Sequence, residues 1–208
     1  NLIKALLGQG AKRLTIVVNS TGGGAGGAGR MPDVGMLVEN GQVAKVICAF
    51  TAATRASDTL PFTKFYEAGE VAAELVPQGT MVERLRAAGS GIPAFYTPAA
   101  VGTELAEGRE TRDFAGRTYL LEHALPVDYT FLRAHRADTM GNLRFRRAQR
   151  NFNPVMAMAA RVSIAEVEED VVPAGAIDAD DVHTAGIFVH RIVRIPADGI
   201  FERRQVTR

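Results

Sequence analysis

The segment Glu74-Leu-Val-Pro-Gln-Gly-Thr80 gives the strongest single indication of the fold class. It closes the short apolar run Val71 to Val76, which predicts a buried strand, and it leads without a linker into a helix predicted from Thr80 to Ala88. Gly89-Ser-Gly-Ile-Pro93 then ends that helix. A strand that passes directly into a helix is the repeating unit of α/β proteins.

The residues before this segment repeat the same rhythm. Leu14 to Val18 and Val43 to Phe50 are short, β-branched runs that predict two more buried strands. A short helix is expected from Asp33 to Val38, and a longer one from Leu60 to Ala68 with Asp58 as its N-cap. Alternation of strands and helices predicts an α/β fold with a mostly parallel sheet flanked by helices.

The residues after it change in character and predict antiparallel additions. Thr111 to Phe114 and Thr118 to Glu122 flank Ala115-Gly116, a pattern typical of a hairpin. The remaining elements are expected as strands at Val127 to Ala134, Leu143 to Arg147, Arg161 to Val167 and Ile187 to Val193, with a helix at Pro154 to Ala160. We predict a single domain over residues 1–208, with an N-terminal segment missing because Asn1 lies inside a helical pattern.

Composition excludes several classes of function. The chain has 208 residues and a formal net charge of +1, which gives no electrostatic case for nucleic acid or an anionic membrane. Its apolar runs are far shorter than a membrane span. The single cysteine, Cys48, rules out an internal disulfide and fits a reducing compartment, so a cytoplasmic location is expected, or a mitochondrial matrix if a leader was removed. The four histidines show no metal-ligand spacing, and no metal site is predicted.

The stretch Gly22 to Gly29 has two interpretations. It follows a predicted strand, and Gly22, Gly24 and Gly27 have the spacing of a dinucleotide-binding turn, which favours a backbone cradle for a ligand. However, Pro32 follows closely and no acidic residue ends the next strand, which favours a flexible surface loop instead. A P-loop is excluded because no Gly-Lys-Ser/Thr is present.

The sequence also contains two charged clusters, and the function of the first has more than one interpretation. One is basic and lies beside Phe145 and Phe152; its members are Arg144, Arg146, Arg147 and Arg150. These arginines fit ligand phosphates, an acidic partner surface, or simply a solvated face. The other cluster is acidic and is interpreted as a solvated strand end; its members are Glu166, Glu168, Glu169 and Asp170.

Gln78 and Gly79 stand where a predicted parallel strand ends and a helix begins. In open α/β sheets this is the place where ligands bind. Gln78 offers an uncharged amide donor to an oxyanion or carbonyl, and Gly79 lets a ligand approach the backbone. A turn that merely caps the helix is the alternative interpretation.

Several motifs in order give the chain a specific resemblance. They are Glu74 to Thr80, Gly91-Ile-Pro-Ala-Phe-Tyr-Thr-Pro98, Gly102-Thr103, Glu107-Gly-Arg-Glu110, Gly141-Asn142, Ala148 to Asn153 and Val182-His-Thr-Ala-Gly-Ile-Phe-Val189. Together they resemble the A (alpha) subunit of the family I CoA-transferases that act on 3-oxo acids, such as 3-oxoadipate or acetoacetate. The resemblance extends from Asn1 to about Val193.

The resemblance implies a mechanism shared with a second polypeptide, the B subunit. Family members transfer CoA by a ping-pong route in which a glutamate of the B subunit holds CoA as a thioester. Gln78 aligns with the family's oxyanion-hole glutamine, and Asn19, Gly79, Gly91 and Phe95 are the expected substrate-binding residues. The expected assembly is A₂B₂ or AB. No permanently bound cofactor is expected, since the CoA thioester is a substrate.

The sequence departs from the family pattern before Asn1, after Val18 and over residues 51–63, and one motif carries a misleading likeness to the B subunit. The family's N-terminal glycine-rich signature would precede Asn1. After Val18 many relatives carry two asparagines, whereas this chain has Asn19-Ser20 and a loop richer in glycine. Glu39-Asn40-Gly41 looks like the nucleophile motif of the B subunit, but Val38 precedes it, and Glu39 is interpreted as a surface residue at a helix end.

Three functions remain in competition. The first is a transferase subunit that moves CoA from succinyl-CoA or acetyl-CoA to a small 3-oxo acid. The second is a CoA-dependent hydrolase or ring-opening relative on the same fold, without the partner glutamate. The third is a ligand-binding or regulatory domain that kept the fold but has no enzymatic activity.

Overall fold

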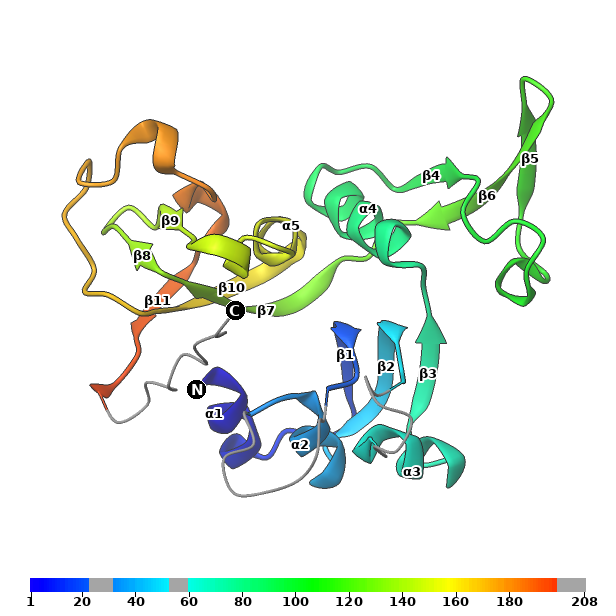
Figure 1. Cartoon of the computed structure of the whole chain (residues 1–208), viewed down its shortest axis with the longest axis horizontal. Helices are drawn as coiled ribbons and strands as arrows, with labels where there is room; N and C mark the ends of the chain where they lie inside the picture. The colour runs from blue at the N-terminus through cyan, green and yellow to red at the C-terminus, as the bar shows by residue number, and fades with distance from the viewer. Residues whose placement is uncertain (23–31, 53–59, 198–208) are drawn as a thin grey trace, which may run out of the picture. The chain divides into compact units, whose positions relative to one another are not determined.

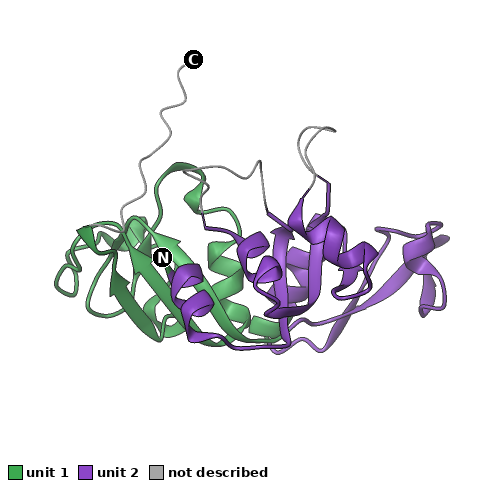
Figure 2. Cartoon of the chain, turned by 90° about the horizontal axis from the view of Figure 1, so that it is seen from below, with its two compact units in different colours: residues 1, 88–90, 126–208 green, residues 2–87, 91–125 purple. Residues whose placement is uncertain are grey.

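The computed structural model describes residues 1–22, 32–52 and 60–197. The chain divides into two compact units, which are coloured separately in Figure 2. The first unit comprises residues 1, 88–90 and 126–208, and the second comprises residues 2–87 and 91–125. The expectation of a single subunit domain over residues 1–208 stays a prediction.

The second unit contains a three-stranded parallel sheet in the order β1-β2-β3. The strands are β1 (Leu14–Ser20), β2 (Val43–Phe50) and β3 (Ala72–Leu75), and the helices around them are α1 (Leu2–Gln9), α2 (Val34–Glu39) and α3 (Pro61–Glu67) (Figure 1). The alternation predicted from sequence is confirmed for each of these strands. The sheet is parallel because a helix after each strand returns the chain to the same starting edge.

An apolar cluster joins the helices of this unit to its sheet. Leu37 and Val38 of α2 and Phe62 of α3 pack with Val46 and Cys48 of β2. Burial raises the pKa of the Cys48 thiol, although a backbone hydrogen bond from Phe50 opposes the rise. The thiol therefore stays protonated near neutral pH, as expected of an inert core cysteine.

Helix α3 begins differently from the expectation. Its N-cap is Leu60 and Pro61 is its first residue, whereas the sequence pattern predicts Asp58 as the cap. Proline favours this position because its fixed φ suits the first helical turn and it lacks an N–H that would go unbonded. Asp58 itself lies outside the described residues.

The second unit also contains an antiparallel sheet in the order β4-β6-β5. Its strands are β4 (Ala94–Thr97), β5 (Thr111–Phe114) and β6 (Arg117–His123), with a 3₁₀ turn η1 (Glu104–Ala106) between β4 and β5. The hairpin around Ala115-Gly116 is confirmed by the pairing of Phe114 with Arg117. Phe114 packs edge-on against Tyr96 and Tyr119, with ring centroids 5.3 and 5.4 Å apart.

The first unit is built on a parallel sheet in the order β11-β10-β7. Its strands are β7 (Val127–Ala134), β10 (Ala160–Val167) and β11 (Arg191–Arg194), and the short pair β8 (Arg136–Ala137) and β9 (Leu143–Arg144) is antiparallel. The helix is α5 (Asn153–Ala159), and the 3₁₀ turns are η2 (Arg147–Gln149), η3 (Ala179–Asp181) and η4 (Gly186–Phe188). Leu132, Leu143, Phe145 and Ala165 lie at the centre of its core.

The last strand is shorter than predicted. The sequence pattern predicts one strand over residues 187–193, but Gly186–Phe188 is a 3₁₀ turn and the strand begins at Arg191. The Ser163 hydroxyl donates to the Phe188 carbonyl, and the Ser163 N–H donates to His190 Nδ1 at 3.1 Å. These side-chain bonds hold the segment against β10 in place of a regular ladder.

Among residues 1–22, 32–52 and 60–197, no helix is long and apolar enough to cross a membrane.

Candidate functional site

The carboxyl ends of β1, β2 and β3 meet at one edge of the parallel sheet. The register pairs Ser20 with Phe50 and Cys48 with Leu75, so the three strands end at neighbouring levels. The pairing continues one residue beyond β3, where the Val76 N–H donates to the Cys48 carbonyl at 2.9 Å. This edge is where open α/β sheets bind ligands, because loops and helix starts gather there.

Gln78 lies at this edge as the first residue of α4 (Gln78–Gly89). The helix starts two residues earlier than the predicted Thr80, and the Met81 N–H donates to the Pro77 carbonyl in its first turn. The Gln78 side chain is exposed, and its Nε2 donates to Asn19 Oδ1 of β1 at 2.9 Å. The structure thus brings together two residues that are 59 positions apart in the chain.

Gly79 follows at the second position of α4 and is also exposed. A methyl group built on its Cα would meet no atom within 4 Å, so no contact with the described residues requires glycine here. Its φ lies outside the left-handed region. Glycine at this exposed position leaves the backbone open to close approach by a ligand.

Gly91 lies away from the Asn19–Gln78 pair, and Phe95 belongs to β4 of the antiparallel sheet. Gly91 follows the far end of α4, and a helix of 12 residues is about 18 Å long. Gly91 has φ +70°, which makes it the residue that turns the chain towards β4. Phe95 pairs with Glu122 in β6 and shares its face with Leu120, and both of these partners are buried. The expected role of Gly91 and Phe95 in substrate binding stays a prediction.

A network of ion pairs fixes the helix that starts with Gln78. Arg84 of α4 donates from Nη1 to Glu74 Oε1 at 2.8 Å and from Nε to the His123 carbonyl at 2.9 Å. Lys45 of β2 holds the other oxygen of Glu74 at 2.6 Å. Burial raises the pKa of Glu74, but the bonds from Arg84 and Lys45 outweigh it and leave the pKa lowered. Sequence reasoning missed this network because its partners come from four elements and share no periodicity.

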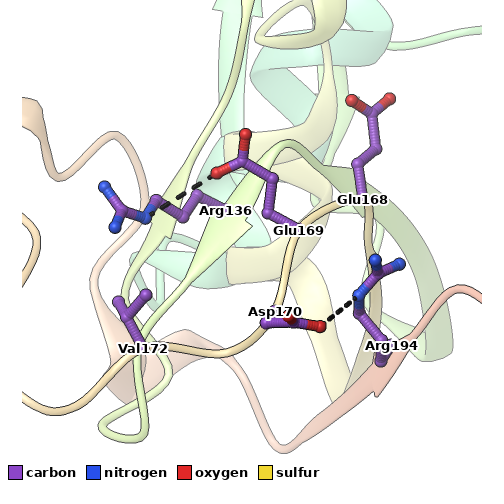
Figure 3. A pocket seen from close by; sticks show the side chains of 6 residues that line it. All are labelled: Arg136, Glu168, Glu169, Asp170, Val172 and Arg194. Atoms are coloured by element: carbon purple, nitrogen blue, oxygen red, sulfur yellow. Dashed lines mark hydrogen bonds and ion pairs between the residues drawn. The ribbon is translucent and has the colours of Figure 1, made fainter.

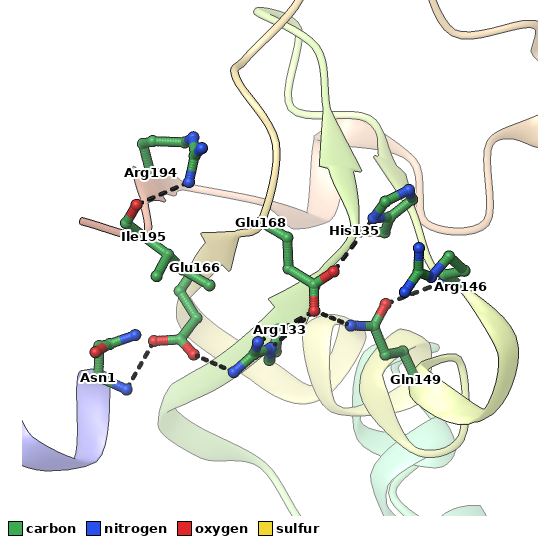
Figure 4. Close-up of polar contacts among 9 residues, drawn as sticks. All are labelled: Asn1, Arg133, His135, Arg146, Gln149, Glu166, Glu168, Arg194 and Ile195. Carbon is green, nitrogen blue, oxygen red and sulfur yellow. Dashed lines mark hydrogen bonds and ion pairs between the residues drawn. The ribbon is translucent and has the colours of Figure 1, made fainter. Parts of the chain in front are cut away.

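The acidic cluster is not the solvated strand end that the sequence suggested. Glu166 is 7% exposed, and Glu168 accepts from Arg133 at 3.1 Å, from His135 at 3.2 Å and from Gln149 at 2.7 Å (Figure 4). Of the four carboxylates, Glu169 and Asp170 are exposed. The expectation was wrong for Glu166 and Glu168, because Arg133 of β7 reaches both carboxylates and Gln149 of the turn before α5 reaches Glu168, which spacing along the chain does not reveal.

A hollow of about 390 Å³ borders this network but offers little to an anionic ligand. Its lining residues are Arg136, Glu168, Glu169, Asp170, Val172 and Arg194 (Figure 3). Arg194 pairs with Asp170 at 2.9 Å, and Arg136 lies 3.8 Å from Glu169. With both guanidinium groups opposed by carboxylates, the hollow has no excess positive charge for a phosphate or a carboxylate.

The lowered pKa of Glu168 allows a prediction of how the stability of the folded chain depends on pH. Burial raises its pKa, but hydrogen bonds from His135 and Arg133 outweigh burial and leave the pKa below its usual value. The stabilisation is therefore complete above the unfolded-state pKa and is lost as pH falls through the folded-state pKa. Glu168→Gln is expected to lower the melting temperature at pH 7, and the difference from the unmodified chain should vanish at acid pH.

Thermal melts of both chains between about pH 7 and pH 3 measure this effect. Glu83→Gln is the matched control, because Glu83 is exposed and pairs along its own helix with Arg86 at 3.1 Å. Its effect is expected to be small at every pH. A Glu168→Gln difference that persists at the acid end would show that packing, and not charge, is responsible.

The basic cluster is partly neutralised. Arg144 Nε lies 3.1 Å from Asp181, while Arg147 and Arg150 are exposed. His183 stands beside it and accepts from the Phe145 N–H at 3.0 Å through Nδ1. Burial lowers the pKa of His183, and the nearby positive charge of Arg150 lowers it further, so the imidazole stays neutral at pH 7.

The stretch Gly22 to Gly29 lies almost wholly outside the described residues.

Comparison with known proteins identifies the family. The family model described as Coenzyme A transferase matches residues 1–194. The chain belongs to the coenzyme A transferase family. This confirms the resemblance carried by the motifs. Glu39, which looks like the nucleophile of a B subunit, is an exposed residue that ends α2.

Two curated members of the family are similar along nearly the whole chain. The A subunit of the 3-oxoadipate CoA-transferase of Pseudomonas putida is 46% identical over 194 residues, which cover 93% of this chain and 80% of that protein. The A subunit of the probable succinyl-CoA:3-ketoacid coenzyme A transferase of Bacillus subtilis (strain 168) is 45% identical over 192 residues, covering 92% of this chain and 76% of that one. Both relatives are A subunits by name.

Solved structures share the fold. A variant of the decarboxylase AibA/AibB is 27% identical with a TM-score of 0.75, and the match covers 99% of this chain and 75% of that one. Glutaconate coenzyme A-transferase from Acidaminococcus fermentans is 21% identical with a TM-score of 0.76, covering 93% of this chain and 65% of that one. The α/β fold class predicted from the sequence is confirmed.

Proposed function

We propose that this chain is the A subunit of a two-subunit CoA-transferase that moves CoA from succinyl-CoA or acetyl-CoA to a small 3-oxo acid such as 3-oxoadipate or acetoacetate. The observation that carries the proposal is the exposed Gln78 amide, held by Asn19 at the carboxyl edge of the sheet, in a chain 46% identical to the A subunit of a 3-oxoadipate CoA-transferase. Asn19, Gln78 and Gly79 supply a donor for a carbonyl oxygen, and none of the three is an activated nucleophile.

The chemistry divides between two subunits. A glutamate of the partner, the B subunit, attacks the thioester carbonyl of the acyl-CoA and expels CoA as a thiolate, which leaves a mixed anhydride between the glutamate and the acyl group. The thiolate then attacks the glutamyl carbonyl of this anhydride, releases the free acid (succinate or acetate) and forms a glutamyl thioester. The 3-oxo acid takes CoA from that thioester by the same two steps in reverse. The Gln78 amide stabilises the negative charge that develops on the thioester carbonyl oxygen. We propose an A₂B₂ or AB assembly in the cytoplasm, with the CoA thioester as a substrate and no resident cofactor.

Co-expression with a B subunit of a coenzyme A transferase tests the proposal. Exchange of CoA from succinyl-CoA to 3-oxoadipate or acetoacetate is measured for the mixture and for each chain alone. Activity is expected only in the mixture. A purified A–B complex that transfers CoA to no 3-oxo acid would overturn the assignment.

A second candidate function keeps the fold without transfer. The decarboxylase that matches this chain with a TM-score of 0.75 shows that the fold also carries other chemistry. A CoA-dependent hydrolase or ring-opening enzyme would release CoA slowly from an acyl-CoA and pass none to an acid. The same assay distinguishes the two, because free CoA accumulates only in the hydrolytic case.

Gly79→Ala tests close approach of the substrate to the backbone. Alanine at this helical position is expected to leave the free energy of unfolding unchanged or to raise it by roughly 0.5–1 kcal/mol, because glycine is the less favourable residue in a helix. We nevertheless expect KM for the acyl-CoA to rise several-fold in the A–B complex. Gly8→Ala in α1, where a methyl group also meets nothing within 4 Å, is the control. Unchanged kinetics in Gly79→Ala would remove Gly79 from the site.

A further inference from the structure

The contact between Asn19 and Gln78 assigns a role to Asn19 that differs from direct substrate binding. We propose that Asn19 is a positioning residue, which holds the Gln78 amide so that an N–H, and not the amide oxygen, is presented to the thioester carbonyl. The proposal rests on the transferase function proposed above. It revises the expectation that Asn19 contacts the substrate itself.

The order of the strands means that the contact between Asn19 and Gln78 spans the width of one strand. Strand β2 lies between β1 and β3, so Asn19 and the start of α4 are separated by one full strand. Neighbouring strands are about 4.8 Å apart, which places β1 and β3 roughly 10 Å from each other. The 2.9 Å bond from Gln78 Nε2 to Asn19 Oδ1 therefore reaches across the carboxyl end of β2.

The two partners differ in how firmly they are held. Asn19 lies within β1, where its neighbours Val18 and Ser20 are paired in register with Cys48 and Phe50. Gln78 is exposed, and its longer side chain has more rotamers to lose on ordering. Asn19 is thus the fixed end and Gln78 the tethered end of the bond.

The tether also selects which amide atom faces the ligand. A glutamine amide has two N–H donors on nitrogen and an oxygen that only accepts. When Nε2 bonds to Asn19 Oδ1, the second N–H of the same nitrogen is left for a ligand oxygen. Without Asn19 the amide can turn its oxygen to the site, where it would repel the developing oxyanion.

A double-mutant cycle in the full A–B complex tests the proposal. The variants are Asn19→Ala, Gln78→Ala and the two together, with Ser20→Ala as control because the adjacent β1 side chain points to the opposite face. Asn19→Ala is expected to lower kcat about 5- to 10-fold, the effect of one lost hydrogen bond, with both KM values within about twofold. In the Gln78→Ala background the same change should have no further effect on kcat.

Two results would overturn the positioning role. One is a fall in kcat on Asn19→Ala that is as large in the Gln78→Ala background as in the unmodified complex. The other is a raised KM for the 3-oxo acid in that background, since either result shows that Asn19 acts without Gln78. Ser20→Ala is expected to behave as the unmodified complex.

A crystallographic readout separates this proposal from the transferase function. If the unmodified complex transfers no CoA, the proposed function fails, but the orientation of Gln78 can still be measured. A crystal structure of the Asn19→Ala complex is expected to show the Gln78 side chain displaced from its position in the unmodified complex. An unchanged Gln78 conformation would contradict the tether whatever the activity.

Discussion

Gln78→Ala is expected to lower kcat for CoA transfer by roughly 10²–10³-fold, because the variant loses one donor to the developing oxyanion. The residue starts α4 at the carboxyl edge of the sheet and is exposed, so its replacement removes no core packing. The measurement is the initial rate of CoA exchange by the purified A–B complex at saturating substrates. The variant complex should form normally and melt at an unchanged temperature.

The control for this experiment lies on the same helix. Arg86 of α4 is exposed and pairs with Glu83 one turn away, so Arg86→Ala should change neither kcat nor KM appreciably. A Gln78→Ala complex that keeps full kcat would show that the capping interpretation is right and that the oxyanion donor lies elsewhere. An equal fall in both variants would point to damage to α4 as a whole.

Gly186→Ala is expected to be the most destabilising methyl addition among the described glycines of the first unit. The new Cβ would overlap the Met140 carbonyl oxygen and lie 2.9 Å from its carbonyl carbon and 3.1 Å from the Gly141 carbonyl carbon. These are backbone atoms that cannot rotate away. We expect a loss of about 3 kcal/mol, at the upper end of overpacking effects, and a melting temperature lower by about 6–12 °C.

The surrounding bonds explain why the backbone at Gly186 cannot yield. Asn142 Oδ1 accepts from the Gly186 N–H at 2.9 Å, and Asn142 is in turn held by the buried Asp138 at 2.9 Å. Gly8→Ala, with open space around the added methyl group, is the control and should melt at or slightly above the temperature of the unmodified chain. An unchanged melting temperature for Gly186→Ala would mean that the backbone around Gly186, Met140 and Gly141 can move apart more easily than the contacts indicate.

Much of the fold could be predicted because local patterns carry it. The apolar runs at Val43 to Phe50 and Val127 to Ala134 became strands with those same bounds, and the Ala115-Gly116 turn joined a hairpin as expected. The failures share one cause. Side-chain bonds to distant elements determine the conformation of residues 187–190 and the burial of Glu166 and Glu168. The periodicity of the sequence does not predict such partners.

The family and the α/β fold class followed from the sequence alone, which also indicated Gln78 as a candidate donor where a strand passes into a helix. Each depends on residue types and order over short distances. The contact between Asn19 and Gln78, and the position of Gly91 after the opposite end of α4, depend on the tertiary structure. It also decided that Arg84, Glu74 and Lys45 fix that helix. Contacts between residues on different strands and helices depend on sheet order and register, which are settled only when the whole core packs.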